Sequence, residues 1–259
     1  MMKQAIRALG WAVSILWIML LLFTVTAVYS ALQIRPSLGE PLAAASGSTL
    51  TASLPIVLYN GGFYDISQFN ITTRVRDNAG ATITRSSTLV PLVSAGANVT
   101  ITHSISISIE QAATNNLSHL LFNDSELEIE AAVGLIYARV FPFEISLNSS
   151  MPWGAPFANL TLGSISVTPL NLTHIRARVP LSFENHSFLA LSGTLELEIV
   201  DRTNHVVGRG STVFNAPSDS RFETNVEIVA SGDPADFREA HLYFQTPFFN
   251  YGPLVMSLV

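Results

Sequence analysis

The strongest constraint on the fold of this chain is an internal repeat. Residues 50–108 and 175–231 follow one pattern about 125 positions apart. Each copy starts with apolar residues at every second position, the period that buries one face of a β-strand. The pairs that match are Leu50 with Ile175, Ala52 with Ala177, Leu54 with Val179, Ile56 with Leu181, and Leu58 with Phe183. The repeat predicts two β domains built on one plan.

The match also includes residues with special backbone or hydrogen-bonding roles. Pro55 and Asn60 recur as Pro180 and Asn185, and after a one-residue deletion the register resumes. The later pairs are Ile71 with Leu195, Thr73 with Leu197, Val75 with Ile199, Asp77 with Asp201, and Thr88 with Thr212.

Residues 11–32 form an uncharged apolar stretch, WAVSILWIMLLLFTVTAVYSAL. About 20 such residues cross a bilayer as a helix. Lys3 and Arg7 precede the stretch, so the positive-inside rule predicts that residues 1–10 are cytoplasmic and the remainder extracytoplasmic. A cleaved signal peptide is the alternative, because Val28 and Ser30 suit positions −3 and −1 of a cleavage site. The run exceeds the about 7–15 apolar residues of such peptides, and we therefore expect a retained single-pass signal anchor.

Breaks in the alternation predict the remaining boundaries. Residues 33–48 hold Pro, Gly and small residues without clear periodicity, which predicts a stalk. The first β-sandwich is expected at 49–147 and the second at 158–259. The segment 148–157 contains two prolines and a glycine and is expected to be the linker. Trp153 within it is expected to pack between the domains, with an exposed ligand platform as the alternative.

Two segments change to a helical character. Residues 109–122 carry an apolar stripe with helical spacing. The second copy has a shortened counterpart at 233–239, where Asp233 can cap a helix that begins at Pro234.

Composition excludes several classes of protein. The chain has no cysteine, which excludes thiol catalysis and cysteine metal sites. Beyond the apolar stretch lie all 19 acidic residues and 11 arginines, so that part has a net charge near −8. This charge argues against nucleic acid or an anionic surface as a partner.

Eight N-x-S/T sequons are expected on the exported side and are candidates for glycosylation. In the predicted strands the Asn alternate with apolar neighbours and are expected to point to solvent, as any polar residue in such a strand would. The candidates are Asn70, Asn98, Asn116, Asn123, Asn148, Asn159, Asn171 and Asn185.

The chain carries no recognisable catalytic or metal-binding motif. Its six histidines are dispersed, and His103 falls on the apolar side of a predicted strand, where a core role is expected. Glu126, Glu128 and Glu130 share one strand face, which we interpret as a solvated face rather than an acid–base pair. We expect no enzymatic activity, no cofactor and no metal site.

The order of elements resembles a known family. Each copy has an alternating strand that ends in Asn and a second strand that runs to an Asp-containing turn; in the second copy Val207-Gly208-Arg209-Gly210 and a Ser-rich turn follow. In this the chain resembles the type 2 late-embryogenesis-abundant proteins, also called water-stress-hypersensitivity domains. The resemblance covers most of residues 48–259, although Asn60 and Asn185 lack the proline that often follows in that family. It implies immunoglobulin-like antiparallel sandwiches with a short helix and no catalytic residues. The family has membrane-anchored relatives, including archaeal ones, and the resemblance therefore also implies an archaeal cell surface.

These features predict a non-enzymatic, membrane-anchored protein of the cell envelope. Its two sandwiches would contact other envelope proteins or subunits of a membrane complex through their edges and loops. The alternative is a surface protein that holds a lipid, a glycan or a small apolar ligand.

Overall fold

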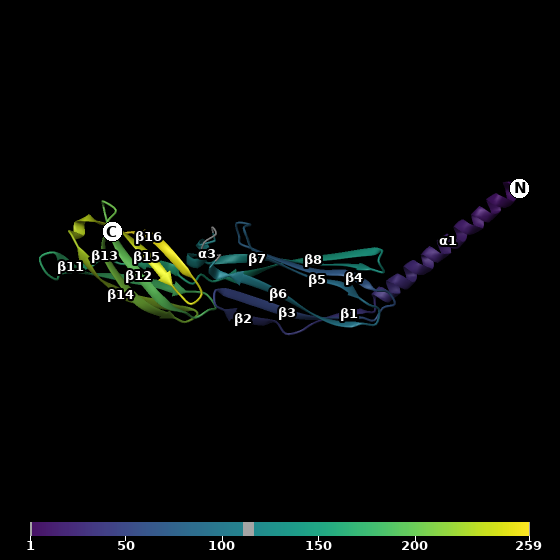
Figure 1. The fold of residues 1–259 in the computed structure, drawn as a ribbon, viewed down its shortest axis with the longest axis horizontal. Helices are drawn as coiled ribbons and strands as arrows, with labels where there is room; N and C mark the ends of the chain where they lie inside the picture. Colours follow the sequence, from purple (N-terminus) through teal and green to yellow (C-terminus); the bar gives the residue numbers. More distant parts are fainter. Residues whose placement is uncertain (1, 111–116, 259) are drawn as a thin grey trace.

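The computed structural model describes residues 2–110 and 117–258. Helix α1 (Met2–Ala31), a first β-sandwich and a second β-sandwich follow one another along the long axis of the molecule (Figure 1). The N-terminus lies at one end, and the C-terminus lies within the second sandwich at the other end. The predicted fold class is confirmed: the chain is mainly β, with an apolar N-terminal helix followed by two antiparallel sandwiches, which we call sandwich 1 and sandwich 2.

Sandwich 1 has two antiparallel sheets that lie one above the other in Figure 1. In one sheet β1 and β2 pair in succession with the same edge of β3, and β6 pairs with its other edge. The second sheet has the order β5-β4-β7-β8. The elements are β1 (Ile34–Leu38), β2 (Leu42–Ser46), β3 (Thr49–Asn60), β4 (Ile66–Arg76), β5 (Thr82–Val93), β6 (Asn98–Ser108), α3 (His119–Phe122), β7 (Ser125–Tyr137) and β8 (Phe141–Trp153).

Sandwich 2 repeats this plan with one difference. Its strands join into a single sheet of order β10-β11-β14-β13-β12-β15-β16, with β9 paired to the β10 edge of β11. The sheet folds over itself into a nearly closed barrel. The elements are β9 (Ala158–Leu162), β10 (Ser166–Pro169), β11 (His174–Asn185), β12 (Leu191–Asp201), β13 (Val206–Ala216), β14 (Ser220–Ser231), the 3-10 turn η1 (Pro234–Asp236), β15 (Phe237–Gln245) and β16 (Asn250–Ser257).

The repeated Asn60 and Asn185 have the same structural role. Both side chains are fully buried at the end of the first long strand of their sandwich. The amide nitrogen of Asn60 donates to the carbonyls of Tyr64, Val93 and Ser94. That of Asn185 donates to the carbonyls of Leu189, Ala216 and Pro217. The two N–H groups of each amide thus bond three backbone carbonyls, one N–H being shared, which explains why both copies need Asn at this position.

The expectation of a stalk at residues 33–48 is wrong, because this segment forms β1 and β2 of sandwich 1. Their counterparts in sandwich 2 are β9 and β10. In both copies the backbone N–H of a glycine between the two short strands donates to the carbonyl of the repeated proline, Gly39 to Pro55 and Gly163 to Pro180, each at 2.8 Å. Short edge strands with one exposed side lack a strong alternation, and the sequence pattern therefore missed them.

The helix α1 ends inside sandwich 1 rather than in a flexible tether. Ser30 is fully buried, and its hydroxyl bonds to the hydroxyl of Tyr137 and accepts from the N–H of Phe63. A Cβ at Gly62 would lie 2.6 Å from the Ser30 hydroxyl oxygen, so this turn needs glycine to admit the helix end. The last two turns of α1 are consequently part of the packing of sandwich 1.

The two sandwiches share a core at their junction. Leu121 of α3 and Phe157, both buried, pack into the core of sandwich 2 together with Phe183 and Phe244. The N–H of Phe157 donates to the carbonyl of Leu121 at 2.8 Å. Of the helix expected at 109–122, residues 109–110 and 119–122 are helical, and residues 111–116 lie outside the described part of the chain. The junction is therefore a packed interface.

The expected linker is also only partly a linker. Residues 148–153 continue β8, and residues 154–157 alone connect the two sandwiches. Trp153 lies in the interface, as expected: its indole N–H donates to the carbonyl of Leu120 at 2.9 Å, and its ring meets Phe188 edge to face. Pro152 was misread as an end of regular structure, because a proline is compatible with an edge strand, whereas Gly154 and Pro156 do lie in the connection.

Candidate interaction surface

Strand β8 forms a free edge of sandwich 1. Its 13 residues pair with β7 from Tyr137 opposite Phe141 to Ser125 opposite Trp153, without a register shift. No described strand pairs with its other side. A long regular edge of this kind presents unpaired backbone groups that another extended chain can bond.

The face of β8 that is directed toward the interior of sandwich 1 is apolar but exposed to solvent. Phe143, Ile145 and Leu147 stand opposite Leu135, Val133 and Ala131 of β7, on the same face of the sheet. Val133 and Leu135 pack against the core, yet the three β8 side chains are 51%, 66% and 69% exposed. The opposite sheet is narrow here, and Leu38 of β1 on its inner side is 70% exposed. The sandwich is therefore open along β8.

Two prolines mark the two ends of the free edge. Pro142 and Pro152 have no N–H, and in an antiparallel ladder alternate residues direct their backbone groups toward and away from the neighbouring strand. Both prolines therefore occupy outward positions, where no bond to β7 is lost. The outward N–H groups between them belong to the even-numbered residues Glu144, Ser146, Asn148 and Ser150. This row of four donors, with one charge at Glu144, is the candidate interaction surface.

The sequence placed the end of the first sandwich at residue 147 but did not identify an exposed edge strand there. The signal was present in the ten-residue spacing of the two prolines, since prolines at positions of the same parity predict an edge strand with its outward N–H groups unbonded.

The sequons differ in accessibility. Asn98, Asn123, Asn148, Asn159 and Asn171 are exposed, and Asn70 is half-buried. Asn116 lies outside the described residues. Asn185 is excluded as a sugar acceptor of the folded domain, because its side chain is fully buried and its amide nitrogen already donates three hydrogen bonds.

The residues screened for chemistry have structural partners. His103 is buried between the hydroxyls of Thr73 and Thr88, at 3.0 and 2.8 Å from its two ring nitrogens, and burial lowers its pKa. Of the three glutamates on β7, Glu126 and Glu128 are exposed, whereas Glu130 bonds Arg74 and Arg76 of β4. Both the core interpretation of His103 and the solvated-face interpretation of the glutamates are confirmed.

A cluster of three titratable side chains lies at the junction of the sandwiches. His186 Nδ1 lies 2.7 Å from Asp124 of sandwich 1, and Nε2 lies 3.1 Å from Glu184. The bond to Asp124, with that to Glu184, raises the pKa of His186. The N–H of Ala155 is the main group that lowers the pKa of Asp124, and the amide of Asn159 is the main group that lowers that of Glu184. The cluster ties the two domains together across their packed interface.

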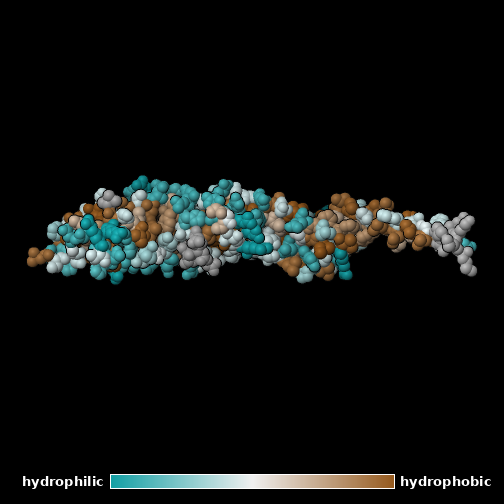
Figure 2. Space-filling view, turned by 90° about the horizontal axis from the view of Figure 1, so that it is seen from above, coloured by the Kyte–Doolittle hydropathy of each residue, from teal (hydrophilic) through white to brown (hydrophobic). Residues whose placement is uncertain are grey.

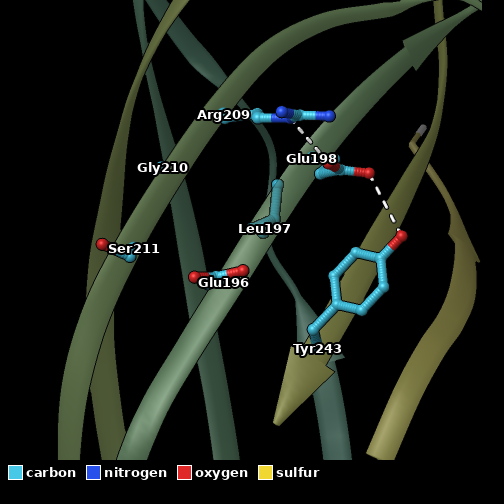
Figure 3. Close-up of a pocket in the computed structure, with 7 residues that line it drawn as sticks. All are labelled: Glu196, Leu197, Glu198, Arg209, Gly210, Ser211 and Tyr243. Atoms are coloured by element: carbon cyan, nitrogen blue, oxygen red, sulfur yellow. Dashed lines mark hydrogen bonds and ion pairs between the residues drawn. The ribbon is translucent and has the colours of Figure 1, made fainter. Parts of the chain in front are cut away.

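A shallow depression on the outer face of sandwich 2 is lined by polar groups that bond one another (Figure 3). Glu198 lies 2.7 Å from the Nε of Arg209 and accepts from the hydroxyl of Tyr243 at 3.2 Å. Burial, together with this carboxylate, raises the pKa of Tyr243. Each oxygen of Glu198 is thus engaged. Within residues 2–110 and 117–258, no three His, Asp or Glu side chains are grouped so that they could hold a metal ion.

Comparisons with known proteins assign no family. No family model matches the sequence, and no curated protein matches it. Red sea bream transglutaminase is similar at 13% identity and a TM-score of 0.29, with 88% of this chain and 31% of that chain covered. A β-glucuronidase of glycoside hydrolase family 2 is similar at 9% identity and a TM-score of 0.31, with 85% and 25% covered. This chain spans less than a third of the length of either enzyme, and likeness this low assigns no activity.

Proposed function

We propose that this protein is a non-enzymatic, membrane-anchored protein of the cell envelope that binds an extended segment of another envelope protein along β8. The observation that carries the proposal is the uncovered edge between Pro142 and Pro152. A row of free backbone donors and acceptors is satisfied by another strand, and the apolar row beside it adds contact area. The partner segment would alternate apolar residues on one face and carry little charge.

The packing of α1 supports a retained anchor. The apolar helical stretch Leu9–Ala31 has 23 residues, which is long enough for a membrane span. Cleavage after Ser30 would remove the helix that packs on sandwich 1, and with it the buried Ser30 hydroxyl that bonds Tyr137 and Phe63. Lys3 and Arg7 would keep the N-terminus in the cytoplasm. Intact mass measurement of the native protein tests retention: we expect the full 28.0 kDa chain plus any sugar.

The interior of the sandwiches is a poorer ligand site than the β8 edge. Large side chains fill the cores, with Tyr137 in sandwich 1 and Phe157 in sandwich 2 among those completely buried. We therefore place the interaction on the edge rather than between the sheets. We retain the likeness to type 2 late-embryogenesis-abundant domains as a proposal, supported by the repeated buried Asn and the short helical segment in each copy.

The binding proposal is tested with a photo-reactive residue at position 147. Leu147 is replaced by a benzophenone amino acid in intact membranes, and Val213 on sandwich 2, 76% exposed, is the control position. We expect a cross-linked partner at 147 and none at 213. Ser146→Pro, which removes one outward N–H, should abolish the adduct, whereas Ser146→Ala, which keeps that N–H, should not. An adduct unaffected by Ser146→Pro, or no adduct at 147, would contradict strand addition.

Sugar attachment is proposed at the five exposed sequons. Peptide mapping by mass spectrometry should find glycans among these sites and none at Asn185. A glycan at Asn185 of the folded protein would contradict its burial.

A further inference from the structure

The end of sandwich 1 beside α1 carries large apolar side chains that are mostly exposed. Figure 2 shows apolar surface continuing from the helix onto the adjoining end of this sandwich. Leu32 after the helix, Phe63 in the turn between β3 and β4, and Val140 in the turn between β7 and β8 are 76%, 67% and 60% exposed. Arg139 beside Val140 is also exposed, at 78% of its side chain. We call Phe63, Arg139 and Val140 the basal loops.

The basal loops lie alongside the last two turns of the membrane helix. Phe23 of α1 stacks on Phe141 with ring centroids 5.8 Å apart and meets Tyr64 edge to face at 5.6 Å. One turn later, the hydroxyls of Thr26 and Tyr64 lie 2.9 Å apart. Protein therefore surrounds one side of the helix from Phe23 onward.

The length of the helix decides where the membrane surface must lie. The 14 residues from Leu9 to Leu22 rise only about 21 Å at 1.5 Å per residue. A hydrocarbon core is about 30 Å thick and needs about 20 residues, so it extends from Leu9 to about Val28. The segment that contacts Phe141 and Tyr64 is thus needed to span the bilayer. If the sandwich stood clear of the lipid, the remaining span would be about 9 Å too short.

On this basis, and resting on the proposed anchoring, we infer that the basal loops of sandwich 1 are seated in the interfacial layer of the bilayer that α1 spans. The overlap of about six helical residues, from Phe23 to Val28, corresponds to a depth of about 9 Å. Interfacial elements bury their apolar faces to depths of about 5–10 Å. Phe63 and Val140 would contact the acyl boundary. The guanidinium of Arg139, 3.8 Å from the carboxylate of Asp65, would lie at the level of the lipid phosphates.

The absence of cysteine makes the depth measurable by single spin labels in the full-length chain. Cysteine is introduced at Phe63 or Val140 as the test positions. Leu16 in the helix and Val213 on sandwich 2 are the membrane and water controls; they are 66% and 76% exposed, so that labels are tolerated. The chain is reconstituted in phosphatidylcholine vesicles, and collisions of the label with oxygen and with a water-soluble nickel chelate are compared.

We expect the labels at 63 and 140 to show a severalfold loss of nickel accessibility relative to position 213, with values between those of 213 and 16. Labels at 63 and 140 that match 213, while 16 is deep in the membrane, would overturn the seating of the basal loops alone. A label at 16 that is accessible to nickel would overturn both this inference and the proposed anchoring.

Discussion

The two sandwiches share a plan but close their sheets differently. In sandwich 2, β13 and β14 pair through their backbones at Gly208 opposite Ala230, and this joins the two sheets. The equivalent residue in sandwich 1 is Thr84, whose hydroxyl reaches the carbonyl of Ser106 on β6 at 2.8 Å. A Cβ at Gly208 would lie 2.7 Å from that of Ala230, too close for any side chain. Glycine thus permits direct strand pairing where hydroxyl side chains otherwise bridge the gap.

The opposite margin also differs between the copies. Leu254 and Met256 of β16 pack against the core of sandwich 2. The corresponding row on β8, with Ile145 and Leu147, is more than 60% exposed. The apolar row on the last strand is therefore covered in sandwich 2 and open in sandwich 1. The repeat preserved the core of each domain, whereas its margins diverged.

The largest difference should appear when an aromatic side chain is removed from each region. Phe157→Ala empties the centre of the shared core, and we expect a loss of about 3–5 kcal/mol in the free energy of unfolding. Phe143→Ala on β8 is the matched control and should cost less than about 1 kcal/mol, because that ring is 51% exposed. Urea denaturation of the chain in detergent measures both. Equal losses would mean that β8 is covered in the folded protein.

The repeated asparagines test what the copies have in common. Asn60→Ala and Asn185→Ala each leave three carbonyls without their donor, and each should cost about 2–3 kcal/mol. The two values should agree within about 1 kcal/mol, since unsatisfied buried groups of one type cost similar amounts. Denaturation curves of the two variants give the values. A negligible effect in either copy would refute the equivalence.

Changes at the pairing of β13 with β14, which joins the two sheets of sandwich 2, should have a smaller effect on the free energy of unfolding. Gly208→Val should separate β13 from β14 and cost about 1–3 kcal/mol through overpacking. Thr84→Val in sandwich 1 removes one hydrogen bond and should cost about 1 kcal/mol or less. Hydrogen exchange of the Arg209 and Val229 amides should accelerate only in the first variant. Unchanged protection there would show that the sheet does not depend on this close approach.

The smallest expected effect is the pH dependence of the stability that His186, Asp124 and Glu184 give to the junction of the sandwiches. The pKa of His186 is raised, so its stabilisation is fully present below its ordinary value and is lost as the pH rises through the raised pKa. The pKa values of Asp124 and Glu184 are lowered, so their contribution is present above their ordinary values and is lost as the pH falls through the lowered ones. The cluster is therefore strongest at about pH 5–6.

His186→Gln should accordingly lower the melting temperature more at pH 6 than at pH 9. His174→Gln, a change at an exposed histidine at the start of β11, should show no such difference. If His186→Gln lowered the melting temperature equally at both pH values, the ion pairs would not stabilise the junction.

The sequence predicted the interior of this protein better than its margins. The alternation from Leu54 and Val179 onward identified strands whose inner residues are buried, because core positions of a strand must be apolar. The edge strands β1 and β2 have one open side, so they do not need alternating apolar and polar residues. The sequence pattern therefore did not reveal them. Asn185 looked like a surface sequon because a local triplet contains no information about three carbonyls contributed by distant turns.

The way α1 enters sandwich 1 also limits how a second protein can arrive. Under the proposed anchoring, the packed helix end and the packed junction would hold both sandwiches in one orientation to the bilayer. Because β8 starts at Phe141, which touches the helix, its open edge would then begin beside the lipid and run outward. Such an edge would favour partners embedded in the same bilayer over molecules that arrive from solution.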